Sequence, residues 1–158
     1  LLRKFLSTKH QPQTLVFLIQ KEVAERITGR GAKKTKTSEG KENLLSLSVK
    51  AYGTPRYGGT VPRGAFSPAP NVDSAILVVS NISREHFAHK KHEEQFFALI
   101  HAGFAQKRKL LKRNLEAVLG EGSAAALETA HIAPNARAED VTLAQWLTLS
   151  SVEGLAKN

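Results

Sequence analysis

Two apolar runs of strand length and several segments with helical spacing divide the first half of the chain. Residues 14–20, TLVFLIQ, form a nearly continuous apolar run, which is typical of a buried parallel strand, and we expect a central strand there. Residues 21–28 follow at once, with Val23, Ala24 and Ile27 at helical spacing. A strand that leads directly into a helix indicates an α/β fold.

Glycine and proline separate the remaining elements of this half. Residues 29–42 have no apolar periodicity and predict a mobile surface loop. The pattern then predicts a helix over 43–53, a turn or short extended segment over 55–62 and a second buried strand over 74–81. The opening residues 1–7 look like the end of a helix and the chain has no methionine, so we expect an N-terminal portion to precede them.

The second half of the chain has helical patterns alone. Phe97, Ile100 and Phe104 recur on one face of a predicted helix, and a domain boundary near 83–92 fits the change of pattern. We predict an α/β domain over residues 1–85 and a small all-α domain over residues 86–158.

The next predicted helix, residues 107–120, is apolar on one face and basic on the other. Leu111, Leu115 and Val118 share the apolar face. The basic side chains that project away from this face are Lys109, Lys112 and Arg113.

Local signals mark helix ends, and none of them forms a nucleotide-binding loop. Gly120 suits a helix terminus, and Thr142 with Gln145 predicts a capping box at the start of the last helix. The glycines of 120–125 follow a helix instead of a strand, and GRGAKKT at 29–35 lacks the spacing of a phosphate loop. We therefore predict no cofactor-binding loop in this chain.

Positive charge is concentrated in the first 113 residues. They hold 21 lysines and arginines against 8 acidic residues, whereas residues 114–158 hold 2 against 6. A local excess of +13 favours a polyanionic partner, because each neutralised phosphate releases counterions. An anionic membrane surface is the competing interpretation, but no basic helix with a wide apolar face accompanies the charge. We expect a nucleic-acid partner and no membrane.

The composition excludes some chemistry. The chain has no cysteine, so it has no disulfide, no thiolate metal ligand and no cysteine nucleophile. The printed residues also contain no run of 18 apolar residues and no segment with the charged start and apolar middle of a signal peptide. We expect a cytoplasmic protein.

Three histidines lie at intervals of three, at His86, His89 and His92. They could converge on a metal if the stretch were helical. The spacing matches no established zinc motif, and Lys90 and Lys91 would repel a cation. We predict a hydrated linker here and no metal site.

The segment QKRKLLKR, residues 106–113, contains five basic residues and no acidic one. Most charge runs are solvated helix faces, but this density favours contacts with phosphates. The predicted RNA-binding residues are Lys107, Arg108, Lys109, Lys112 and Arg113.

Phe66 lies in AFSPAP, just before the second predicted strand. A phenylalanine usually fills a core position. Pro68 and Pro70 stiffen this segment, however, and a rigid loop beside a strand end is where α/β proteins place ligand contacts. A ring held there can stack on an extruded base. Both interpretations stay open on the chemistry alone.

Four segments together resemble the rRNA adenine dimethyltransferases, and specifically the kasugamycin-resistance type that modifies two adjacent adenines near the 3′ end of small-subunit rRNA. VFLIQKEVAERI at 16–27 resembles the family's strand and helix after the catalytic loop, and VPRGAFSPAPNVDSA at 61–75 its target-base loop. FAQKRKLLKRNL at 104–115 is similar to its RNA-contacting segment, and IAPNARAEDVTLAQW at 132–146 to its C-terminal region. They occur in the family's order.

The resemblance implies a fold and a site. The fold is the second half of a Rossmann-like S-adenosylmethionine-dependent methyltransferase domain followed by a small all-α domain. The implied role of Phe66 is catalytic, as the aromatic ring that stacks on the target base. The glycine-rich cofactor loop and the Asn-Leu/Ile-Pro-Tyr motif of the family do not occur in this chain. The chain departs from the family pattern at residues 29–42 and at Asn71, where the family usually has lysine.

The resemblance also implies an activity for the intact enzyme. It is the methylation of the 6-amino groups of two adjacent adenines, with S-adenosyl-L-methionine as cofactor and small-subunit rRNA or a pre-ribosomal particle as partner. This chain alone is expected to be inactive. Two alternatives are a 23S rRNA adenine methyltransferase of the antibiotic-resistance type, which VDSA at 72–75 and the long helical tail disfavour, and a non-catalytic RNA-binding or ribosome-assembly relative.

Overall fold

The computed structural model describes residues 2–30 and 41–152 of the chain. These residues divide into two compact units. One unit consists of residues 2–30 and 48–84, and the other of residues 41–47 and 85–152. The boundary between the units therefore crosses the chain more than once, and each unit is described by itself.

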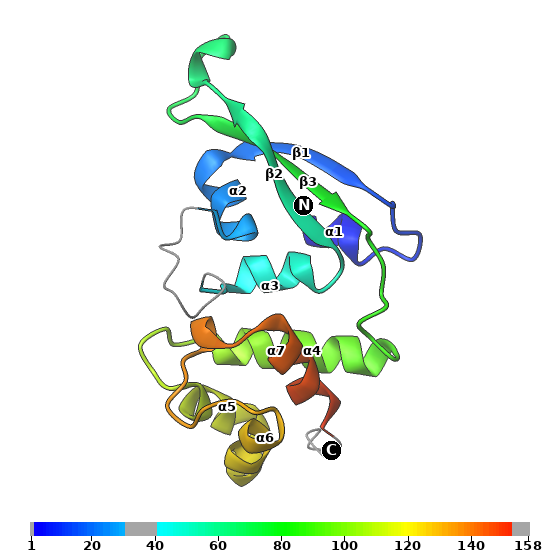
Figure 1. The fold of residues 1–158 in the computed structure, drawn as a ribbon, viewed down its shortest axis with the longest axis vertical. Helices are drawn as coiled ribbons and strands as arrows, with labels where there is room; N and C mark the ends of the chain where they lie inside the picture. The colour runs from blue at the N-terminus through cyan, green and yellow to red at the C-terminus, as the bar shows by residue number, and fades with distance from the viewer. Residues whose placement is uncertain (1, 31–40, 153–158) are drawn as a thin grey trace. The chain divides into compact units, whose positions relative to one another are not determined.

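Strands occur only in the earlier part of the described chain, and helices alone follow (Figure 1). The elements up to the last strand are α1 (Leu2–Leu6), β1 (Leu15–Gln20), α2 (Lys21–Thr28), α3 (Leu44–Lys50), β2 (Thr54–Val61), a 3-10 turn (Arg63–Ala65) and β3 (Ser74–Ser80). The later elements are α4 (Lys90–Gly103), α5 (Leu111–Leu119), a 3-10 turn (Gly120–Gly122), α6 (Ser123–Thr129), a 3-10 turn (Ala138–Asp140) and α7 (Leu143–Ser151). The α/β class predicted for the first part is confirmed at this level.

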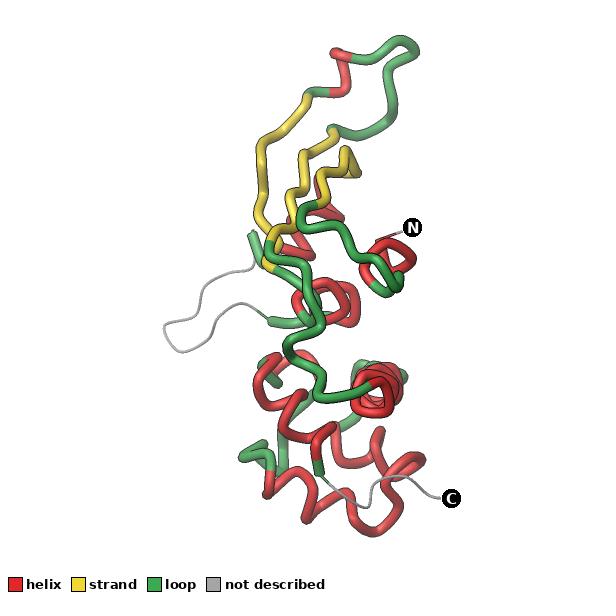
Figure 2. Tube along the Cα trace, turned by 90° about the vertical axis from the view of Figure 1, so that its right-hand side faces the viewer, coloured by secondary structure: helices red, strands yellow, loops and turns green. Residues whose placement is uncertain are grey.

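The three strands form one sheet in the order β1-β3-β2, and β3 is antiparallel to both neighbours. Ala75, Leu77 and Val79 on one face of β3 are fully buried, as the apolar run predicted. Helix α2 contacts all three strands, and Phe5 of α1 lies 6.1 Å from the ring of Phe17 on β1. Helices therefore cover this face of the sheet, as the side view in Figure 2 shows.

The prediction for β1 is wrong in two respects. β1 is an edge strand of the described sheet instead of a central one, and it pairs antiparallel with β3 instead of lying in a parallel sheet. β3 is its one partner in the described sheet, and its apolar side chains alternate in burial: Val16 is 65% exposed and Leu18 is 52% exposed. An unbroken apolar run indicates that both faces of a strand can be buried, but here only alternate side chains are covered.

Residues 54–61 form a full strand where a turn or short extended segment is predicted. A bulge between Tyr57 and Gly59 shifts the register against β3. Gly59 has a φ of 147°, and a Cβ on Gly58 would lie 2.9 Å from Ile76. The two glycines that suggested a turn instead allow the bulge and the close approach of β3.

Several predicted helix features are confirmed. Phe97 and Ile100 are buried on one face of α4, whereas Phe104 lies just after the end of the helix and is half-buried. Gly120, at a φ of 58°, follows the last residue of α5. In the capping box of α7, the Gln145 amide donates to Thr142 Oγ1 at 3.3 Å, and the Thr142 amide donates to Gln145 Oε1 at 3.1 Å.

The centre of the helical unit is Trp146 of α7, which is fully buried. Gly103, the last residue of α4, lies against its ring: a Cβ added there would be 2.4 Å from Trp146 and 3.0 Å from Leu111. Phe104 follows and stacks on Trp146, with ring centroids 6.1 Å apart. The end of α4, the start of α5 and α7 therefore meet at one point, which only a residue without a side chain permits.

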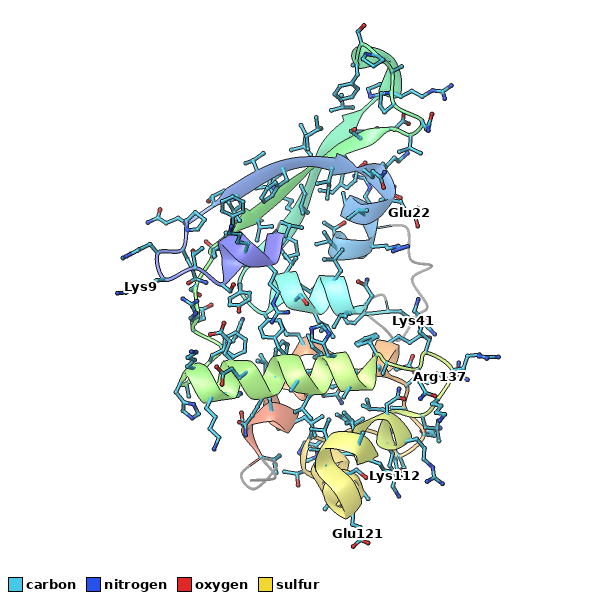
Figure 3. The ribbon with its side chains drawn as sticks, turned by 180° about the vertical axis from the view of Figure 1, so that it is seen from behind. Lys9, Glu22, Lys41, Lys112, Glu121 and Arg137 are labelled. Carbon is cyan, nitrogen blue, oxygen red and sulfur yellow. The ribbon has the colours of Figure 1, made fainter. Side chains whose placement is uncertain are left out.

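Residues 41–47 join the helical unit through Glu139 in its last 3-10 turn. Lys41, labelled in Figure 3, forms an ion pair with Glu139. The Glu42 amide donates to the Glu139 carbonyl at 2.9 Å. The side-chain hydrogen bond to Glu139, and the charge of Glu139, raise the pKa of Lys41, so Lys41 stays charged at neutral pH. The loop predicted over residues 29–42 lies mostly outside the described residues.

Gly103→Ala should destabilise the protein, because the new methyl group has no space between Trp146 and Leu111. Overpacking of this kind costs about 1–3 kcal/mol, more than alanine returns through its better helix propensity. Gly122→Ala is the matched control, since nothing lies within 4 Å of its Cβ position and its φ is −70°. Urea unfolding should show a lower midpoint for Gly103→Ala and little change for Gly122→Ala. Equal midpoints for the two variants would contradict the packing described here.

Candidate nucleic-acid interface

The predicted target-base loop is the connection between β2 and β3, residues 62–73, which extends beyond the ends of both strands (Figure 1). Phe66 follows the 3-10 turn in an extended conformation, and its amide donates to the Arg63 carbonyl at 3.3 Å. Phe66 is half-buried, whereas Pro68 and Pro70 are exposed. Part of Phe66 is therefore accessible to a partner.

Asp73 holds this loop at the end of the sheet. Its carboxylate Oδ1 accepts a hydrogen bond from the Arg63 amide at 3.0 Å, which joins the two ends of the loop. Its backbone carbonyl accepts from the amide of Lys21, the first residue of α2, at 3.0 Å. β1 and β2 are both antiparallel to β3, so their carboxyl ends meet there: Gln20 and Val61 both pair with Ser74. The loop therefore projects from the carboxyl ends of β1 and β2.

A groove of about 490 Å³ lies beside this loop. Its lining comes from the start of α2 and from both ends of the loop, and consists of Gln20, Lys21, Glu22, Glu25, Arg63, Asn71, Val72 and Asp73. Cations, carboxylates and two side-chain amides thus share one surface, which can offer both donors and acceptors to a polar ligand. Phe66 is not part of this lining.

The predicted RNA-binding residues lie together in the helical unit, and all five are exposed. They are Lys107, Arg108, Lys109, Lys112 and Arg113. Figure 3 shows that the Lys112 side chain points away from α5. Arg113 forms an exposed ion pair with Glu116 at 3.3 Å, whereas the described residues provide no ion pair for the three cations before α5. The cluster therefore presents cations that are mostly not neutralised by the protein.

The helix predicted over residues 107–120 is wrong at its start. Lys107 to Lys109 lie in a turn between α4 and α5, and α5 begins at Leu111. The side-chain amide of Asn114 donates hydrogen bonds to two carbonyls before the turn, and the Leu111 amide donates to the Ala136 carbonyl. These bonds hold the backbone in a path that is not helical. The apolar face is confirmed at Leu111 and Leu115, which are fully buried, whereas Val118 is half-buried.

The three histidines do not form a cluster of ligands, and the described residues contain no group of three histidine, cysteine or acidic side chains placed to hold a metal. His92 is buried, its Nε2 lies 2.9 Å from Ser150 Oγ, and its Nδ1 accepts from the Ala88 amide at 3.3 Å. His89 caps α4 by accepting from the His92 amide. The predicted hydrated linker is wrong at Phe87 and His92, which are buried, whereas His86 and His89 are exposed as predicted.

Two residues of the interface are not predicted from the sequence. Asp73 belongs to VDSA, but its role depends on Arg63, ten residues earlier in the chain. Asn114 carries a usable signal, because it occupies the apolar face of α5 between Leu111 and Leu115. An asparagine on an otherwise apolar helix face indicates a buried amide with specific partners.

The fold is shared with part of two solved structures of RNA-modifying enzymes. The crystal structure of the 23S rRNA methyltransferase ErmE matches with a TM-score of 0.66 at 21% identity, covering 92% of this chain and 56% of that one. A dimethyladenosine transferase from Plasmodium falciparum matches with a TM-score of 0.69 at 20% identity, covering 92% and 59%. These likenesses define the class of fold.

The chain belongs to the ribosomal RNA adenine dimethylase family, whose sequence profile matches residues 1–153. A ribosomal RNA small subunit methyltransferase A of Dehalococcoides mccartyi is 38% identical over 154 residues, which are 96% of this chain and 50% of the relative. Those of Fusobacterium nucleatum and Latilactobacillus sakei are 30% and 38% identical, covering 96% and 86% of this chain and 56% and 46% of the relatives. The chain therefore spans about half the length of these curated relatives. The family predicted from four sequence segments is confirmed.

Asp73→Ala should loosen the target-base loop, because it removes the acceptor of the Arg63 amide. Loss of one hydrogen bond of this kind is worth about 1 kcal/mol, or roughly a fivefold change in local opening. Hydrogen exchange should accelerate across residues 62–73 but not at Leu77 in β3. Asp73→Asn, which keeps a side-chain oxygen, is the control and should exchange more slowly than Asp73→Ala. Exchange in Asp73→Ala equal to that of the unaltered chain would show that the carboxylate does not hold the loop.

Proposed function

We propose that this chain is the part of a small-subunit rRNA adenine dimethyltransferase that stacks the target base and grips the RNA backbone. The observation that carries this proposal is the exposed cluster of five cations in a chain that matches the family over residues 1–153. The accessible Phe66, on a loop that Asp73 holds at the strand ends, supplies the second contact. Cations contact phosphates without reading sequence, whereas a stacked ring fixes one base.

The fold supports a finer assignment. We propose that the three-stranded sheet with α1 and α2 is the second half of a Rossmann-like methyltransferase domain, and that residues 86–158 are a small all-α domain that binds RNA. In the sheet, β1 lies beside β3, and it runs directly into α2. A junction from a strand end to a helix is where α/β proteins place ligand sites. Helices α4 to α7 supply the later part.

The reaction proposed for the intact enzyme is the methylation of the 6-amino groups of two adjacent adenines near the 3′ end of small-subunit rRNA. S-adenosyl-L-methionine would supply the methyl group. The contribution of this chain is to hold the adenine: Phe66 stacks on one face of the base and limits its rotation. The cation cluster holds the flanking backbone, so that the base is presented in one orientation.

The described residues do not fit the cofactor. Its recognition in a Rossmann-like fold needs a glycine-rich turn between a strand and a helix. The one direct strand-to-helix junction here, from Gln20 to Lys21, contains no glycine. The glycines around Gly58 lie within β2, and Gly103 and Gly120 lie at helix ends. The cofactor would therefore depend on a part of the enzyme that lies outside the residues described.

The proposed partner is small-subunit rRNA, free or in a pre-ribosomal particle, and the proposed compartment is the cytoplasm. No helix among residues 2–30 and 41–152 has the length and hydropathy to cross a membrane. One alternative is a non-catalytic RNA-binding or ribosome-assembly relative, which would use the same cation cluster and need no methyl donor.

The chain alone should bind structured RNA yet bind no S-adenosylmethionine and methylate nothing. The excess of +13 over residues 1–113 supports the first part, and the absence of a suitable glycine turn among the described residues supports the second. Calorimetry with S-adenosylmethionine and a methyl-transfer assay on small-subunit rRNA measure both. Micromolar binding of the cofactor by this chain would place a cofactor site in it and overturn the assignment.

Reversing Lys109, Lys112 and Arg113 to Glu should weaken RNA binding and flatten its salt dependence. The slope of log affinity against log salt falls by about 0.7–0.9 for each phosphate that the protein no longer neutralises, so it should fall by roughly 2–3. The control is the triple reversal of Lys9, Lys90 and Lys91, which are exposed and change the net charge equally. If both triple variants show the same slope, the cluster is not at the interface and only the overall charge matters.

Phe66→Ala should reduce stacking on the target adenine, at a cost of about 1–3 kcal/mol in binding of a single-stranded or looped RNA. An RNA hairpin with 2-aminopurine in place of the target adenine reports stacking through quenching of its fluorescence. Phe66→Trp, which keeps an aromatic face, should retain the quenching. Quenching that survives Phe66→Ala would return Phe66 to a packing role.

A further inference from the structure

A buried asparagine connects the helical core to the turn that carries three of the five cations. Asn114 of α5 is 8% exposed. Its side-chain Nδ2 donates to the Gly103 carbonyl at 2.6 Å and to the Gln106 carbonyl at 3.1 Å. Both acceptors are backbone atoms at the start of the turn between α4 and α5. One side chain therefore fixes the path of the chain as it leaves α4.

Two further backbone hydrogen bonds hold the rest of the turn, and both depend on the path that Asn114 gives to the chain. The Lys109 amide donates to the same Gln106 carbonyl at 3.0 Å, which closes the turn around Lys107 and Arg108. The Leu111 amide donates to the Ala136 carbonyl at 2.9 Å and fixes the start of α5. The backbone of the turn is therefore ordered, while the side chains of Lys107 to Lys109 remain exposed.

We propose that Asn114 is a positioning residue for RNA binding, which holds Lys107, Arg108 and Lys109 in the arrangement that meets the phosphates. This inference rests on the proposed function of the cluster. Binding is strengthened when the contacting groups are ordered before the partner arrives, because less conformational entropy is then lost. Asn114 orders the backbone beneath these cations and does not need to touch RNA.

The chemistry of the amide explains why asparagine suits this position. A side-chain amide has two N–H donors, and Asn114 uses both on carbonyls. Aspartate has the same shape, but its ionised carboxylate has no donor and would face two carbonyl oxygens. Alanine would leave the carbonyl of buried Gly103 without this partner, and the Gln106 carbonyl would keep only its bond from the Lys109 amide. Each replacement removes the clamp without changing any of the five cations.

The test compares RNA binding by the 158-residue chain and its Asn114→Ala and Asn114→Asp variants. The probe is an RNA hairpin that carries two adjacent adenines in its loop and the flanking sequence of the 3′ end of small-subunit rRNA. Loss of order in three long side chains should weaken affinity about tenfold. In Asn114→Ala, the slope of log affinity against log salt should stay close to that of the unaltered chain, because every cation is still present.

A matched control separates positioning from general instability. Leu119→Ala lies at the other end of α5, removes a buried side chain of the same helix and leaves the Asn114 clamp intact. It should lower the thermal midpoint while leaving RNA affinity within about twofold of the unaltered chain. Trypsin supplies a second readout without RNA, because it cleaves after lysine and arginine: cleavage after residues 107–109 should accelerate in both Asn114 variants and not in Leu119→Ala.

The outcomes distinguish this inference from the function on which it rests. Unaltered RNA affinity in folded Asn114→Ala overturns the positioning role while leaving RNA binding by the cluster in place. No RNA binding by the unaltered chain overturns both, and trypsin then still reports whether the clamp exists. If neither variant folds, hydrogen exchange on the unaltered chain decides: the Asn114 side-chain amide should stay protected with and without RNA, and exposure of this amide in the complex overturns the proposal.

Discussion

The packing of Gly103 against Trp146 is the constraint on which the helical unit depends. Trp146 is fully buried, and its indole N–H has no hydrogen-bond partner among the described residues, so packing alone fixes the ring. Gly103 gives the ring its space, and the same residue supplies a carbonyl to Asn114. The end of α4, the placement of α5 and the turn that bears the cations therefore follow from one residue without a side chain.

Elements whose signal is local could be predicted from the sequence. The amphipathic spacing of α4, the glycine after α5 and the capping box at Thr142 are each set by residues within a few positions, and the structure confirms them. The prediction for β1 failed because strand burial depends on what covers the second face of the sheet. An apolar run indicates that a strand can be covered, and Val16 and Leu18 show that the described residues do not cover it.

The candidate interface also contains some residues that could be predicted from the sequence and others that could not. Phe66 and the five cations are visible as residue types in the sequence, although the stacking role of Phe66 comes from the family resemblance and remains a proposal. Asp73 and Asn114 act on backbone groups ten and eleven residues away, respectively. A sequence gives no direct sign of such pairs, because the acceptor or donor is main chain and carries no residue-specific signal. The position of Asn114 on an apolar helix face is the clue that the sequence does offer.

The interleaving of the two units limits how this protein can be divided or recombined. The chain contributes residues 41–47 to the helical unit before it completes the sheet, and the rest of that unit follows only from residue 85. A piece that begins at residue 85 would lack Lys41 and the amide of Glu42, so both the Glu139 carboxylate and its carbonyl would lose their partners. The helical unit is therefore not a contiguous cassette. An exchange of RNA-binding parts between related enzymes would have to carry both segments together.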